Sequence, residues 1–235
     1  MKKISPILAL LLIAATAQAK GPWRDPATHC TMDEQNAVDA ALPAAKSRVF
    51  NVQQKFAEIA PPGPDGENYL AQSRKRELDA LGRVIFGADY DNVDVDYYIR
   101  GMRDVLMSHP AISCSDQTDT HCGGRSGYVM SDARTIHVCP NFFNSQPGGK
   151  GVDLSAEAAE QRVRTLVHES AHVAGISEKD GTESYCGMFT CDASCGSDGA
   201  KVADNWSQWV HCGSGQTADQ PLAITASATG GSRIP

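Results

Sequence analysis

The eight cysteines constrain the fold of this chain more than any other feature, because each disulfide fixes two distant segments against each other. They are Cys30, Cys114, Cys122, Cys139, Cys186, Cys191, Cys195 and Cys212. An even number of cysteines in an exported chain predicts disulfides, here up to four. The alternative is a structural zinc site built from the last four, which the oxidising compartments outside the cytoplasm disfavour.

The N-terminal segment indicates export. Residues 1–19 contain Lys2 and Lys3, a short apolar run and the pattern Ala17-Gln18-Ala19, which are together typical of a signal peptide cut after Ala19. The apolar run, about a dozen residues long, is too short to span a bilayer comfortably. We therefore expect a secreted or periplasmic protein that is not held in a membrane after the signal is removed.

Charge and length narrow the possible partners and the domain organisation. Without the signal the chain has 19 basic and 28 acidic residues, a net charge of −9. Its longest run of basic residues is Arg74-Lys75-Arg76, which is too short to form a basic patch, so we expect no nucleic-acid partner. The length suits one domain, assigned to residues 20–212, which we expect to be monomeric. Residues 213–235 are small, polar and aperiodic, and they predict a flexible C-terminal tail.

Apolar residues spaced by three or four predict three helices in the first half of this domain. They cover residues 33–60, 67–85 and about 93–108. Pro43 is expected to kink or divide the first of them. Asp91 or Asn92 is expected to cap the third.

The second half of the domain has a different pattern. The short runs at 126–130 and 135–139 are typical of strands joined in a hairpin. A further helix is expected to start at a cap supplied by Asp153 or Ser155 and to stop at Gly175. The predicted fold class is therefore α+β, mostly helical, with a small β-hairpin or sheet.

The sequence His168-Glu169-Ser-Ala-His172 lies on this last predicted helix. Histidines four residues apart share one helix face, so both imidazoles can bind one zinc ion. Glu169 is then placed to take a proton from water bound to the zinc, whose pKa the metal lowers to about 7. The pattern predicts the zinc site of a hydrolase, against the alternative of two ordinary surface histidines.

Two histidines supply only two of the three protein ligands that catalytic zinc usually has. The acidic residues after Gly175 are the candidates for the third: Glu178, Asp180 and Glu183. Glu178 lies six residues after His172, where the metzincins have a histidine or an aspartate. A protease similar to the metzincins, using Glu178, is one of the alternatives.

Several motifs resemble the aspzincins, the family of deuterolysin and the peptidyl-Lys metalloendopeptidases. They are "HESAH" followed by "GTESYCG" (181–187), "VIFG" (84–87), "GYVM" followed by "TIHVCPNFF", and "VADNWSQWV" (202–210). Their shared order extends the resemblance from Cys30 to Val210. It implies a zincin-like fold with an active-site helix carrying the two histidines, and a zinc-dependent endopeptidase activity.

The resemblance also implies roles for single residues. The family has an aspartate ligand where this chain has Ser184, so we rank the adjacent Glu183 first, Asp180 second and Glu178 third. Tyr185 resembles a tyrosine that donates a hydrogen bond to the oxyanion in this family, and the alternative is a packed tyrosine with its hydroxyl at the surface.

Asp204 is a candidate to hold a ligand histidine by its second ring nitrogen, with a helix-capping or a solvated aspartate as the alternatives. The implied disulfides are Cys122–Cys139 and Cys30–Cys114, and the pairing among the last four cysteines stays open.

Together these features predict a secreted zinc metalloendopeptidase acting on protein or peptide substrates. One zinc ion per chain is expected, bound by His168, His172 and an acidic residue. The alternative from another class is a secreted, disulfide-rich binding or effector module whose metal site is degenerate. Cleavage specificity, including any preference for lysine, does not follow from the sequence.

Overall fold

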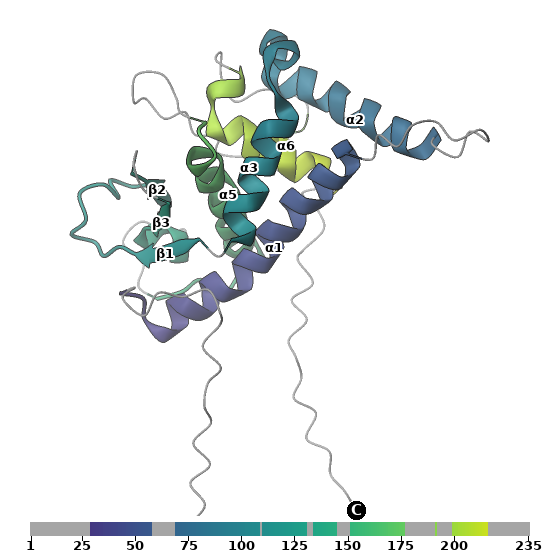
Figure 1. Cartoon of the computed structure of the whole chain (residues 1–235). Helices are drawn as coiled ribbons and strands as arrows, with labels where there is room; N and C mark the ends of the chain where they lie inside the picture. The colour runs from purple at the N-terminus through teal and green to yellow at the C-terminus, as the bar shows by residue number, and fades with distance from the viewer. Residues whose placement is uncertain are drawn as a thin grey trace, which may run out of the picture.

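The structure is a computed structural model, which describes residues 29–57, 69–108, 110–130, 134–144, 151–176, 191 and 199–215. The signal peptide predicted at 1–19 lies outside these residues, and so does the predicted tail from residue 216 onward. The fold is α+β and mostly helical, with one small three-stranded sheet at one side of the molecule (Figure 1).

The helices are α1 (Met32–Ala57), α2 (Tyr69–Phe86), α3 (Val95–Met107), α4 (Pro140–Phe143), α5 (Ala156–Val173) and α6 (Ala203–Gly213), with short 3-10 helices η1 (Gly87–Asn92) and η3 (Gly199–Lys201). Helix α5 is central, since it packs against α1, α3, α4 and α6 and also against the sheet (Figure 1). Within the described residues, no helix combines the length and the apolar character needed to cross a membrane.

The three helices predicted in the first half are confirmed, with small changes at their ends. Helix α1 continues through Pro43 without division. Asp94 caps α3 by accepting a hydrogen bond from the Tyr97 amide, so the expected caps Asp91 and Asn92 are wrong. Both of those residues belong to η1, one step earlier in the chain.

The predicted hairpin is confirmed as β2 (Gly127–Val129) paired antiparallel with β3 (Thr135–Val138). Strand β1 (Ala111–Cys114), which was not predicted, pairs with β3 in parallel and completes the order β1-β3-β2. Strand β2 is thus an edge strand, and it is the strand that contacts α5 most directly.

Aromatic side chains from α6 form the centre of the apolar core. Trp206 and Trp209 are completely buried, and the Phe86 ring lies with its centroid 4.7 Å from that of Trp206. Each indole N–H has a backbone acceptor, Ala200 O for Trp206 and Leu78 O for Trp209. A hydrogen bond to the indole N–H removes most of the free-energy penalty of burying this polar group, so the ring can be buried in the apolar core. This core holds α6 on α2 and η3.

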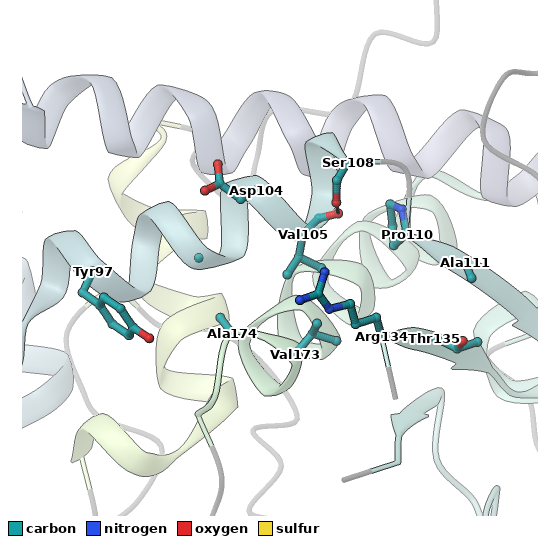
Figure 2. A pocket seen from close by; sticks show the side chains of 11 residues that line it. Tyr97, Asp104, Val105, Ser108, Pro110, Ala111, Arg134, Thr135, Val173 and Ala174 are labelled. Carbon is teal, nitrogen blue, oxygen red and sulfur yellow. Dashed lines mark hydrogen bonds between the residues drawn. The ribbon is translucent and has the colours of Figure 1, made fainter. Parts of the chain in front are cut away.

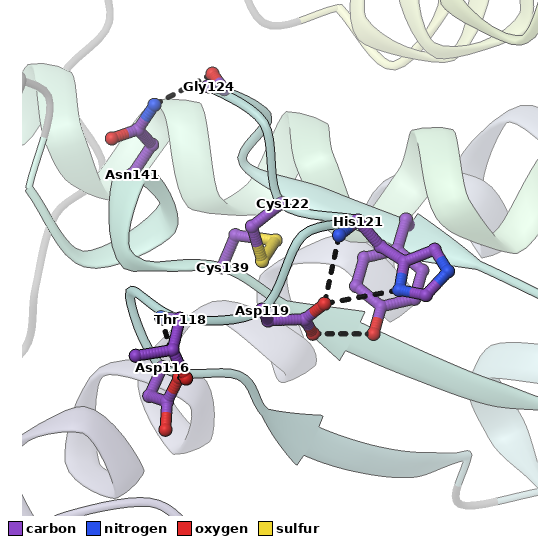
Figure 3. Close-up of a disulfide and its surroundings, with 9 residues drawn as sticks. Asp116, Thr118, Asp119, His121, Cys122, Gly124, Cys139 and Asn141 are labelled. Atoms are coloured by element: carbon purple, nitrogen blue, oxygen red, sulfur yellow. Dashed lines mark hydrogen bonds and ion pairs between the residues drawn. A yellow bond between two sulfur atoms is a disulfide. The ribbon is translucent and has the colours of Figure 1, made fainter.

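Three disulfides join described residues. Cys30–Cys114 ties the start of α1 to β1, and Cys122–Cys139 closes the loop before β2 onto the end of β3 (Figure 3). Both pairings were expected from the family resemblance and are confirmed. The third, Cys191–Cys212, connects the segment before α6 to the C-terminal turn of that helix and excludes a zinc site made by all four late cysteines.

Candidate metal centre

The two histidines of the sequence motif lie next to each other on the last turns of α5. His168 is buried and His172 is half-buried, and their Nε2 atoms are 3.1 Å apart. The helix explains this placement, because residues four apart stand on one face about one turn from each other. Ser155 caps α5 and Gly175, with φ of 96°, ends it, both as predicted.

The Nδ1 atom of each imidazole has its own acceptor. His168 Nδ1 donates to Asp204 Oδ1 at 2.6 Å, and His172 Nδ1 donates to the Ile176 carbonyl oxygen at 2.8 Å. A carboxylate and a carbonyl only accept, so the proton of each neutral ring is on Nδ1. Both Nε2 lone pairs are consequently directed at the same small region between the rings.

This donor set fits a divalent metal such as zinc. Two nitrogens bound to one tetrahedral zinc at 2.0–2.1 Å lie roughly 3.3–3.4 Å apart. The observed 3.1 Å separation is close to that value. Ligand histidines typically donate their other N–H to a carboxylate or a backbone carbonyl, and here one histidine does each.

Glu169 lies beside the two imidazoles. Its carboxylate and the two histidine rings offer ligand-type atoms that all lie within 4.8 Å of one another. Its side chain is only 1% exposed and lies against β2, where a Cβ added to Gly127 would come within 3.0 Å of Glu169 Oε1. Glycine at that position of the strand therefore makes room for the carboxylate.

The tertiary structure explains how Asp204 reaches His168. Helices α5 and α6 pack side by side, and three polar contacts follow their interface. Asp204 contacts His168, Ser207 donates to the Arg164 carbonyl oxygen at 3.1 Å, and His211 Nδ1 lies 3.1 Å from Glu160 Oε1. These contacts set the register of one helix on the other.

The last of these contacts belongs to a buried charge cluster that the sequence analysis did not find. Arg48 on α1 forms a two-point ion pair with Glu160, at 2.6 and 2.5 Å. Burial alone would raise the pKa of Glu160, but the hydrogen bonds and charges of Arg48 and His211 hold it well below its usual range. The ion pair thereby connects α1 to the start of α5, and the contact of His211 with Glu160 connects α6 to the same cluster.

The remaining predicted site residues cannot be placed. Glu178, Asp180, Glu183 and Tyr185 lie outside the described residues. Of the described residues on either side of them, Ile176 accepts a hydrogen bond from His172 Nδ1 and Cys191 is bonded to Cys212 of α6. The identity of the third ligand stays a prediction.

Comparison with known proteins gives no match for this chain among family models, curated proteins or solved structures. The residues and the geometry of the site are therefore what indicates the function of this chain.

Proposed function

We propose that this protein is an exported zinc-dependent endopeptidase. The observation that carries the proposal is the pair of imidazoles on α5, each oriented by an Nδ1 acceptor so that the two Nε2 atoms lie 3.1 Å apart. Two ordinary surface histidines would not be expected to share burial, fixed ring orientations and Nε2 atoms directed at one point. The disulfides support export, since such bonds persist in oxidising compartments.

His168 and His172 would hold the zinc, with an acidic side chain from the sequence after Ile176 as third ligand. We keep Glu183 as the first candidate and Asp180 as the second. Zinc in such a site polarises a peptide carbonyl and makes water more acidic.

Glu169 supplies the proton transfers in this proposal. Its carboxylate takes a proton from the attacking water and later passes it to the amine that leaves when the C–N bond breaks. Burial against β2 holds the carboxylate in place beside the histidines. Asp204 stabilises the required tautomer of His168. Tyr185 is proposed to donate a hydrogen bond to the oxyanion, in line with the resemblance to the aspzincins.

The test measures zinc content and peptide hydrolysis of the purified mature chain and of Glu169→Gln. We expect about one zinc per chain in both, and a loss of roughly 10²–10⁴-fold in kcat/KM for the variant, the usual contribution of a general base. Glu157→Gln is the matched control, because this exposed glutamate lies in the first turn of the same helix.

Undiminished hydrolysis by Glu169→Gln would refute the assigned role. A chain that contains no zinc after zinc reconstitution and cleaves no peptide would instead favour the secreted binding module.

A further inference from the structure

A cavity separate from the histidines opens where α3, the end of α5 and the first residues of β1 and β3 meet (Figure 2). Its volume is about 600 Å³, within the range of pockets that hold small ligands. Val105, Pro110, Val173 and Ala174 form apolar parts of its wall. None of its lining residues belongs to the metal centre, although Val173 directly follows His172.

The cavity has one positive charge that nothing in the described part of the chain compensates. Arg134 extends from the start of β3 toward α3 and the end of α5 (Figure 2), and among the described residues no carboxylate pairs with it. Asp104, the one acidic residue that lines the cavity, is already paired with Arg103 at 2.5 Å. A guanidinium with no carboxylate partner among the described residues is notable in a chain whose net charge without the signal is −9.

An aromatic ring marks the other end of the cavity. Tyr97 is 59% exposed although it is a large aromatic residue. It lies eight residues before Val105 on α3, which corresponds to about 12 Å along the helix axis. An extended peptide advances about 3.3 Å per residue, so roughly three to four residues cover this distance.

We propose that this cavity binds a short peptide segment that carries a carboxylate. The carboxylate pairs with the Arg134 guanidinium, whose fork matches two oxygens, and an apolar side chain two or three residues away packs on Tyr97. The hydroxyl groups of Ser108 and Thr135 line the cavity and are available to the peptide backbone. The carboxylate can come from a chain terminus or from an acidic side chain.

The test is calorimetric titration of the mature chain carrying Glu169→Gln, so that binding is measured whether or not the wild-type protein hydrolyses peptides. Three probes are used: acetyl-Phe-Ala-Ala with a free carboxylate, acetyl-Phe-Ala-Glu amide, and the uncharged acetyl-Phe-Ala-Ala amide. At least one of the two charged probes should bind about five- to tenfold more tightly than the uncharged one, and less so at high salt. The charged probe that binds more tightly identifies the source of the carboxylate.

Two variants and one control locate the site. Arg134→Gln should abolish the preference for the charged probe, and Val105→Phe should weaken all binding by filling the cavity. Arg76→Gln is the control, since Arg76 is an exposed arginine on α2 away from the cavity. Equal binding of charged and uncharged probes, no binding of any probe, or an equal loss in Arg76→Gln would overturn the proposal. None of these results bears on the zinc site.

Discussion

Replacing Asp204 by Asn tests whether the contact between α5 and α6 orients His168 for the proposed metal centre. The variant keeps the size of the side chain and removes its charge. The 2.6 Å contact from His168 Nδ1 then becomes a neutral hydrogen bond. Hydrogen bonds to charged groups contribute about 1.5–3 kcal/mol and neutral ones about 0.5–1.5 kcal/mol. The interaction between His168 and residue 204 should therefore weaken by about 1–1.5 kcal/mol.

That loss acts mainly on metal binding, because zinc increases the positive charge on His168 and thus the value of a carboxylate behind it. At about 1.4 kcal/mol per factor of ten, we expect zinc affinity to fall roughly 5–12-fold, which reaches the lower end of the range usual for changes to the partner of a ligand histidine. The measurement is competition with a chromophoric chelator at pH 7, alongside thermal unfolding of the metal-free proteins.

Ser207→Ala is the matched control. Ser207 lies on the same face of α6 and donates to the Arg164 carbonyl oxygen, but it does not touch either histidine. Its zinc affinity should equal that of the wild type. The reasoning fails if Asp204→Asn binds zinc as tightly as the wild type, or if Ser207→Ala loses as much affinity.

Two more predictions concern the support of the site. Glu160→Gln leaves the buried Arg48 charge without its carboxylate and should lower the free energy of unfolding by about 2–3 kcal/mol at pH 7. Because the pKa of Glu160 is lowered in the fold, its stabilisation is complete above the unfolded value of 4.5 and declines at lower pH. In urea unfolding, the difference in the free energy of unfolding between wild type and variant should become smaller below pH 4.5. A difference that does not change with pH would contradict this. Gly127→Ala places a methyl group within 3.0 Å of Glu169 Oε1 and 3.1 Å of the His137 carbonyl oxygen. It should lower kcat/KM about tenfold with little change in melting temperature, and unchanged kinetics would show that the carboxylate position is unimportant.

The secondary structure was predictable where it depends on local pattern. Helices α1, α2, α3 and α5 repeat apolar residues every three or four positions, and the β2–β3 hairpin pairs neighbouring segments. Strand β1 was missed because it has only four residues and pairs with a strand more than twenty residues later. Such a short run has too few alternating positions to distinguish it from a loop.

The amino-acid sequence by itself determined the spacing of His168 and His172, since four residues on any helix place two side chains on one face. Only the tertiary structure decided which atoms orient these rings. Asp204 is 36 residues from His168 and the Arg48–Glu160 pair spans 112, so both contacts depend on how whole helices pack. The place of Arg134 in a cavity, without a carboxylate partner among the residues that the structure describes, likewise depends on how α3, α5 and the sheet pack together. The spacing of side chains along one helix follows from backbone geometry. Charge pairing between distant residues depends on how helices pack on one another, and no short segment of sequence specifies that packing.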